Sequence, residues 1–299
     1  MKMDLFVPLS RFSRHWRLIL SGRSDAARNM AVDEALLENY RRTGHPVFRV
    51  YGWSPPAFSL GVAQNAEQSL YLKRCRQAGV MVVRRMTGGG VLFHGPDISY
   101  SIVCAAADIG GMTSVRESFR RLCAFLIFWY RTMGLEARFA DAHPGFRARN
   151  YSDYGNRPDF CLASCERDDL LLGTRKIGGN AQKRSRSLLF QHGSVPLRPF
   201  WDEAAVFFRD DLRGAASLSG TLEEFTGQKI SFSRAQQSLA AAFRQAFGVQ
   251  LRQTALSPEE ERSARRFIHD KYARPEWNRK REYTRRTNDQ HQKKTSLAS

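Results

Sequence analysis

A cysteine and a lysine in the middle of this sequence could together carry out nucleophilic chemistry. Cys161 stands fifteen residues before Lys176, and Cys165 lies between them. A cysteine attacks as its thiolate, and a neighbouring cation favours that form. A cysteine considered alone is more often buried and unreactive, and most lysines are merely solvated. The pair therefore predicts a covalent nucleophile only if the fold brings the two side chains together.

Three consecutive glycines, Gly88–Gly90, form a second candidate for chemistry. Glycine lets a backbone approach a ligand where a Cβ would obstruct it, so the run could bring N–H groups against a carbonyl or phosphate. A glycine-rich hairpin with a bulge explains the same run equally well. No Gly-Lys-Ser/Thr sequence follows and no helix is expected after the glycines, which excludes a P-loop and a Rossmann fingerprint.

A glycine pair and two histidines complete the set. Gly178 and Gly179 closely follow Lys176, and a lysine on a strand beside two glycines can reach a carbonyl or phosphate near the backbone. His94 follows the glycine triplet, and His192 lies in a later apolar segment. Each histidine is either a proton shuttle or a core side chain.

The elements that must position these residues form a mixed pattern. Apolar alternation predicts strands at 16–20, 46–51, 57–61, 79–85, 98–105, 135–139 and 188–195, and a hairpin of 170–172 with 175–181. Helical periodicity predicts helices at 25–37, 67–78, 114–133 and 258–272, short helices between 201 and 247, and a polar loop over 141–158. We expect an α+β fold with a mixed, mainly antiparallel sheet and flanking helices over residues 14–250, followed by a small helical extension at 251–278.

Composition limits the kind of protein. Of 299 residues, 42% are hydrophobic and 20 are phenylalanine, which predicts a real core. The five cysteines are an odd number, and the first twenty residues hold no apolar run long enough for a signal or a membrane span. We therefore expect a soluble cytoplasmic protein with reduced thiols.

The net charge of +18 predicts attraction to an acidic partner. Residues 279–299 contribute seven Lys/Arg against Glu282 and Asp289 in a polar segment without apolar periodicity, which favours a disordered basic tail. No zinc-finger spacing or RNA-binding aromatic motif accompanies this charge, so nucleic acid is not the expected partner.

Several motifs occur together in a fixed order. They are NMAVDEALL (29–37), RVYGWSPPAFSLGVAQN (49–65), RRMTGGGVLFHG (84–95), RKIGGNAQ (175–182), LFQHGSVPL (189–197) and KYARPEWN (271–278). From about Trp16 to Asn278 the chain thereby resembles the lipoate–protein ligase and octanoyltransferase family. The resemblance implies the catalytic domain that this family shares with biotin protein ligases, a class II synthetase-like fold.

Two chemistries share that domain. The ligases activate lipoate with ATP and Mg²⁺ as lipoyl-AMP, whereas the octanoyltransferases carry octanoyl on a cysteine and need no cofactor. The segment DFCLASCERDDLLLGTRK (159–176) resembles the transferase arrangement, as do LFQHGSV and the acidic residue ahead of Tyr-Ser in HGPDISYS (94–101). The GGG form of the glycine run is also common among ligases, Cys165 stands where proline is common, and Gly95 follows His94 in place of aspartate.

The resemblance implies ping-pong transfer of octanoyl from acyl carrier protein to Cys161, then to a lysine of a lipoyl domain or of the glycine-cleavage H protein. Lys176 would stabilise the thiolate and the oxyanion, and the segment Val91–Phe93 would contact the acyl chain. In the ligase alternative, Lys176 would contact the acyl-adenylate and Cys161 would take no part. Cys161 and Lys176 are thus the expected catalytic residues, and no metal ligand is expected. The expected substrate-binding residues are Arg84, Arg85, Thr87, Gly88, Gly89, Gly90, His94, Gly178, Gly179, Asn180, Ala181, His192 and Gly193.

Overall fold

A computed structural model describes residues 15–111, 114–143, 160–210, 212 and 215–280. Most of the loop predicted over 141–158, and all but the first two residues of the tail predicted over 279–299, lie outside this part of the chain. In the described part, no helix combines the length and the hydropathy that crossing a membrane would require.

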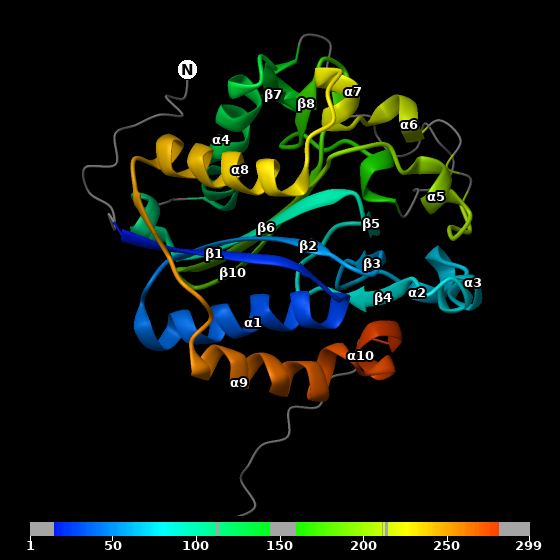
Figure 1. The fold of residues 1–299 in the computed structure, drawn as a ribbon, viewed down its shortest axis with the longest axis horizontal. Coiled ribbons are helices and arrows are strands. Elements are labelled where there is room, and N and C mark those ends of the chain that lie inside the picture. Colours follow the sequence, from blue (N-terminus) through cyan, green and yellow to red (C-terminus); the bar gives the residue numbers. More distant parts are fainter. Residues whose placement is uncertain (1–14, 112–113, 144–159, 211, 213–214, 281–299) are drawn as a thin grey trace, which may run out of the picture.

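A six-stranded mixed sheet forms the centre of the molecule (Figure 1). Its strands, in spatial order, are β10 (Gly179–Ser185), β11 (Leu188–Pro196), β6 (Asp97–Ala105), β2 (Val47–Trp53), β1 (His15–Ser24) and β12 (Gln250–Gln253). The pairs from β10 to β2 are antiparallel, while β1 pairs in parallel with both β2 and β12. The prediction of a mixed, mainly antiparallel sheet is confirmed.

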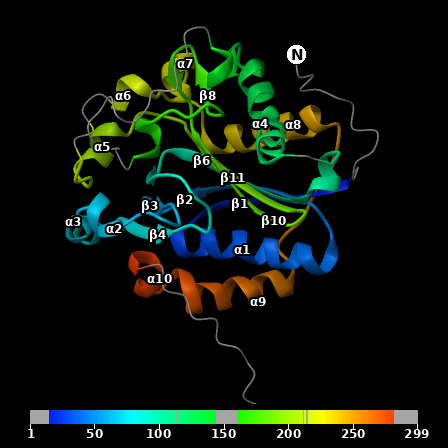
Figure 2. The same ribbon diagram turned by 180° about the vertical axis from the view of Figure 1, so that it is seen from behind.

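Helices cover both faces of this sheet. Helices α1 (Ala26–Thr43) and α9 (Pro258–Phe267) lie on one side, and α4 (Val115–Thr132) and α8 (Phe232–Phe247) on the other (Figures 1 and 2). Each layer has its own apolar core between helices and sheet. Because both faces are covered, every residue of β2 and all but the last of β6 are buried. Asp25 caps α1 by accepting a hydrogen bond from the Arg28 N–H, as its position predicted.

Two small three-stranded sheets flank the main one. The first contains β4 (Met81–Arg84), β3 (Ala57–Leu60) and β5 (Leu92–His94) in that order; the second contains β7 (Ala137–Phe139), β8 (Leu170–Leu172) and β9 (Arg175–Lys176). Strand β3 separates β4 from β5, pairing in parallel with the first and antiparallel with the second. The glycine triplet therefore joins two strands that do not pair, and the hairpin interpretation is wrong.

Two predicted elements are divided in the structure. The helix expected over 67–78 becomes α2 (Ala66–Ser69) and α3 (Leu72–Gln77), because Leu70 is extended and bridges to Phe208. The strand expected over 175–181 is split between β9 and β10. Gly178 lies between them with a φ of 79°, and the two strands join different sheets.

The C-terminal segment packs back onto the rest of the chain. It supplies β12, a strand of the main sheet that the sequence did not predict, and then α9, a π-helical turn (Ile268–Tyr272) and α10 (Pro275–Lys280). The remaining helices are α5 (Trp201–Ala205), α6 (Ala215–Leu218), α7 (Leu222–Thr226) and 3₁₀ turns at Ala106–Ile109, Ala140–Ala142 and Cys161–Ala163.

Candidate active site

The structure brings Cys161 and Lys176 together. Cys161 begins a 3₁₀ turn that is held to the residue immediately before β5, because its N–H donates to the Val91 carbonyl at 2.9 Å. Lys176 ends β9, and its Nζ lies 3.9 Å from Cys161 Sγ. The same ammonium donates to the Cys161 carbonyl at 3.0 Å and to the Ser164 carbonyl at 3.1 Å. The turn thus wraps around the cation and holds the sulfur beside it.

Asp169 completes this cluster, and the sequence did not single it out. Its carboxylate lies 2.8 Å from Lys176 Nζ and also accepts from the Glu166 N–H. Burial alone would lower the pKa of Lys176, but the charges of Asp169 and Cys161 outweigh burial and raise this pKa above its ordinary value. Lys176 is therefore a fixed cation, with its three N–H bonds directed at two carbonyls and one carboxylate.

Nine of the predicted site residues line one pocket. They are Arg85, Gly89, His94, Cys161, Gly179, Asn180, Ala181, His192 and Gly193. Leu92, from the segment expected to contact the acyl chain, lines it too. The sequence did not predict its other lining residues, which are Met30, Tyr51, Trp53, Ser59, Ser99 and Ser194. A Cβ on Gly179 would lie 3.3 Å from Cys161 Sγ, so a glycine there leaves room beside the thiol. All three residues of the apolar triplet belong to one buried core, and of the three Leu92 also lines the pocket. Cys165 does not line this pocket.

The glycine triplet is folded around the guanidinium of Arg85. Arg85 Nη2 donates to the carbonyls of Gly88 and Gly90 at 2.8 and 2.6 Å, and Nη1 donates to the Ser59 carbonyl at 2.7 Å. Gly89 has a φ of 89°, a conformation that favours glycine. Burial lowers the pKa of Arg85 to about 10, and the negative charge of the Cys161 thiolate acts in the opposite direction. Arg85 thus brings a second buried cation to the pocket.

Some predicted residues lie outside the pocket. Arg84 points the other way, donating to carbonyls of the loop after β3 and of α10 (Gly61, Val62, Gln64, Trp277, Asn278 and Arg279). Gly178 does not line the pocket, and a Cβ there would lie 2.5 Å from the Ser194 carbonyl. Thr87 contacts the pocket through its Oγ1, which lies 2.6 Å from His192 Nε2.

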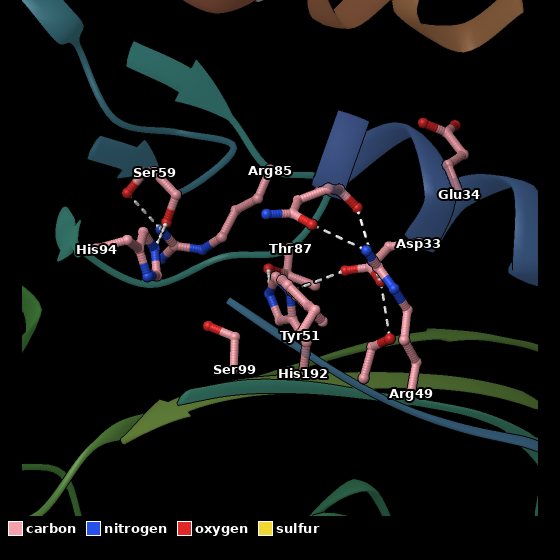
Figure 3. A network of polar contacts seen from close by, with 12 residues as sticks. Asp33, Glu34, Arg49, Tyr51, Ser59, Arg85, Thr87, His94, Ser99 and His192 are labelled. Carbon is pink, nitrogen blue, oxygen red and sulfur yellow. Dashed lines mark hydrogen bonds and ion pairs between the residues drawn. The ribbon is translucent and has the colours of Figure 1, made fainter. Parts of the chain in front are cut away.

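A Ser–His–Asp arrangement forms one wall of the pocket. His94 Nε2 lies 2.8 Å from Ser59 Oγ, and His94 Nδ1 lies 2.8 Å from Asp97 Oδ2. The imidazole also stacks on Trp53 with ring centroids 3.9 Å apart. Asp97 accepts from Ser194 as well, and its pKa is lowered because these contacts and the nearby His94 outweigh burial, which alone would raise it. Figure 3 shows Ser59, His94 and Arg85 side by side.

A second buried cluster surrounds Asp33. Its carboxylate pairs with Arg49 at 2.7 Å, accepts from the Tyr51 hydroxyl, and lies 3.8 Å from His192 Nδ1 (Figure 3). Burial would raise the pKa of Asp33, but Arg49 and His192 hold it below its ordinary value. Burial lowers the pKa of His192, which favours the neutral ring. Glu34, the next residue, is directed away from the cluster (Figure 3).

Sequence reasoning missed Asp33 and Ser59, whose partners Arg49 and His94 stand 16 and 35 positions away in the chain. Asp33 and Ser59 lie within motifs that carry the family resemblance, so motif membership was the available signal. Asp169 lies between the cysteine and the lysine, and an acidic residue there was the signal for an ion pair. Among the residues the structure describes, no cluster of three or more His, Cys, Asp or Glu side chains is arranged to hold a metal ion.

Comparisons with known proteins identify the family of this chain. Residues 25–244 match the family described as "Lipoyl protein ligase A/B catalytic domain". The octanoyltransferase LipM of Kyrpidia tusciae is 32% identical over 274 residues, which is 88% of this chain and 98% of that protein. The LipM of Bacillus subtilis is 29% identical over 275 residues, 89% of this chain and 98% of that protein.

Solved structures extend the likeness to the fold. A lipoate-protein ligase A bound with ATP superposes with a TM-score of 0.72 at 21% identity, covering 88% of this chain and 98% of that one. A bi-partite lipoate protein ligase, studied with its E2 lipoyl domain from Thermoplasma acidophilum, gives a TM-score of 0.73 at 20% identity, covering 92% and 100%. This chain belongs to the lipoyl protein ligase A/B catalytic domain family.

Proposed function

We propose that this protein is an octanoyltransferase of protein lipoylation, which accepts octanoyl from acyl carrier protein on Cys161 and passes it to a lysine of a lipoyl domain. The observation that carries this proposal is the placement of Cys161 Sγ in the pocket, 3.9 Å from the buried ammonium of Lys176. The two LipM relatives, which this chain matches over 98% of their length, are named octanoyltransferases.

In the first half-reaction, the Cys161 thiolate attacks the thioester carbonyl of the octanoyl carrier. A new carbon–sulfur bond forms, the bond to the carrier sulfur breaks, and the carrier leaves as a thiolate that takes up a proton. Lys176 stabilises negative charge on Cys161 Sγ and then on the carbonyl oxygen by its proximity. Because all three of its N–H bonds are engaged, its contribution is a fixed positive charge.

In the second half-reaction, the neutral amine of the acceptor lysine attacks the acyl-cysteine. An amide bond forms, the amine loses a proton, and Cys161 is released as the thiolate. Leu92 contributes an apolar surface for the chain, and each buried CH₂ adds about 0.8 kcal/mol to binding. The acceptor is a lipoyl domain or the glycine-cleavage H protein, and the proposed setting is the cytoplasm, where thiols stay reduced.

The alternative is an ATP-dependent lipoate–protein ligase, which would bind ATP and Mg²⁺ and use Lys176 to contact the acyl-adenylate. Lys176 fits that role poorly, because its ammonium already donates to Cys161, Ser164 and Asp169 and has no N–H left for a phosphate. The transferase needs neither cofactor, and the thiol beside Lys176 has a role only in that reaction.

Intact-mass spectrometry after incubation with octanoyl-acyl carrier protein tests the proposal. We expect a hydroxylamine-labile octanoyl adduct on the wild type and on Cys165→Ser, which serves as the matched control. The adduct should be absent from Cys161→Ser. Full octanoyl transfer by Cys161→Ser would overturn the cysteine mechanism. Lipoylation that requires ATP and free lipoate would instead assign the protein to the ligases.

A further inference from the structure

A second groove lies between α3, β4 and α10, separate from the pocket that holds Cys161. Leu72, Val80, Val82 and Pro275 give it an apolar lining, and Arg76 of α3 and Arg279 of α10 also line it. Both figures place α3, β4 and α10 at the same end of the molecule (Figures 1 and 2). The groove combines an apolar floor with cationic edges.

The helices that border this groove are strongly basic. Helix α3 carries Lys73, Arg74 and Arg76 without an acidic residue, and α10 carries Arg279 and Lys280 against the single Glu276. These basic side chains are exposed. Within the described part of the chain, neither Arg76 nor Arg279 forms an ion pair with a carboxylate. Their charges are therefore available to a partner, which should be acidic.

We propose that this groove docks the acidic carrier protein that delivers the octanoyl thioester, with an amphipathic helix of the carrier placing its apolar face on the floor and its carboxylates against Arg76 and Arg279. The inference rests on the proposed function, since it names the docking surface for the donor of that reaction. An apolar floor with a charged rim is the usual arrangement of a transient protein interface.

The basic tail of this chain is a poor occupant of the groove. Residues 281–299 continue directly from α10 and carry five further Lys/Arg against Glu282 and Asp289. Like charges facing Arg76 and Arg279 would disfavour docking of the tail, whereas an acidic carrier complements them.

The groove is connected to the reaction centre by β4. Met81 and Val82 line the groove, and Arg85, just after the strand, lines the pocket with Cys161. Four residues of extended chain span about 13 Å. A carrier seated on the groove therefore has its thioester arm within reach of the thiol.

Arg84 also connects the groove to the glycine triplet. Its guanidinium joins carbonyls of α10 to the carbonyl of Gly61, and Gly61 touches the glycine triplet so closely that a Cβ there would lie 1.8 Å from the Gly89 carbonyl oxygen. A partner bound in the groove would therefore contact α10, which Arg84 connects to the loop beside Cys161.

Charge reversal tests the docking surface. The Arg76→Glu/Arg279→Glu double variant should raise the KM for octanoyl-acyl carrier protein about tenfold or more, while leaving transfer from octanoyl-pantetheine, a thioester without the protein, unchanged. Arg244→Glu is the matched control, because Arg244 is exposed on α8, which lies on the other side of the main sheet from α10. Thermal unfolding of each variant confirms that the fold is retained.

Three results would overturn the docking surface. They are an unchanged KM for the carrier in the double variant, an equal loss of transfer from the carrier and from octanoyl-pantetheine, and an equal rise in KM in Arg244→Glu. A raised KM for the acceptor lipoyl domain in place of the carrier would also overturn it. If the wild type acylates Cys161 from neither donor, the proposed function fails instead. In that case, fluorescence anisotropy with carrier lacking its prosthetic arm still decides the docking, since the double variant should bind it about tenfold more weakly.

Discussion

At the scale of single residues, the decisive feature is that Lys176 is a permanent cation. A raised pKa means that its ammonium contributes stability below the ordinary lysine pKa, and that this contribution is lost only as the pH rises through the higher value in the folded protein. Lys176 therefore keeps its charge throughout the neutral range. It is suited to stabilising an anionic sulfur and a developing oxyanion, and poorly suited to carrying protons between reaction steps.

Replacing Lys176 by methionine should make the Cys161 thiol much less reactive. We expect the rate of iodoacetamide alkylation of Cys161 at neutral pH to fall at least about tenfold in Lys176→Met, because a charge 3.9 Å away is lost. The measurement uses a Cys165→Ser background so that one of the two half-buried thiols is removed. Adding Asp169→Asn to Lys176→Met removes the carboxylate left unpaired and restores stability without restoring reactivity. Unchanged alkylation would show that Lys176 does not activate the thiol.

At the scale of elements, the conformation of the glycine triplet depends on Gly61, a glycine in the loop after β3. Gly61→Ala should lower both thermal stability and Cys161 acylation, since its Cβ would lie 1.8 Å from the Gly89 carbonyl oxygen and would displace the loop that holds Arg85. Overpacking of this kind costs about 1–3 kcal/mol. Gly88→Ala is the matched control, because a Cβ at Gly88 meets nothing within 4 Å. Differential scanning fluorimetry and the acylation assay measure both effects, and equal behaviour of the two variants would contradict the explanation.

The cluster around Asp33 should make stability depend on pH, because it joins α1, β2 and β11. Since the pKa of His192 is lowered, the unfolded chain binds a proton that the folded protein does not, once the pH falls below about 6.5. The free energy of unfolding should therefore fall with pH below that point. Below about pH 4, the lowered pKa values of Asp33 and Asp97 add a further loss.

His192→Gln should flatten only the upper part of this dependence. Glutamine can still contact Thr87 but does not titrate, so the loss between about pH 6.5 and 5 should shrink while the loss at lower pH remains. Urea unfolding at several pH values measures the free energy of unfolding of both proteins. The groups facing His192, namely Asp33, Arg85 and His94, are unchanged in this variant. An unaltered slope above pH 5 would show that another group causes it.

The elements that were predictable from the sequence are those whose signals are local. Helix α1 follows from its Asp25 cap and its apolar period, and β6 from a continuous strand-forming run. The break at Leu70 was not predictable, because it arises from pairing with Phe208, far along the chain. The same limit applies to the site. Motifs pointed to Arg84, but only the fold shows that its guanidinium faces α10 and not the pocket.

At the scale of the whole molecule, the C-terminal segment is fastened to the first helix and strand of the chain. Lys271 pairs with Glu34 at 2.7 Å, and Arg84 binds the carbonyls of α10. Glu260 is buried in α9 and accepts two hydrogen bonds from Arg17 of β1, at 2.5 and 2.9 Å. These contacts join residues 193 to 243 positions apart, and we propose that residues 251–278 unfold together with the catalytic domain.

Glu260→Ala tests that cooperativity. Removing the carboxylate takes away the ion-pair partner of Arg17 and an acceptor of the Asn39 side chain, and breaking a buried pair from one side costs about 3–5 kcal/mol. Because the contact lies between the two ends of the chain, the loss should appear as a lower midpoint of one global transition, with circular dichroism and tryptophan fluorescence coinciding. Glu259→Ala is the control, since Glu259 is exposed, pairs with the exposed Arg262, and its loss should leave the midpoint in place. If 251–278 formed an extension that melts by itself, Glu260→Ala would instead separate an early transition from an unaltered main one, and Cys161 acylation would survive the first of them.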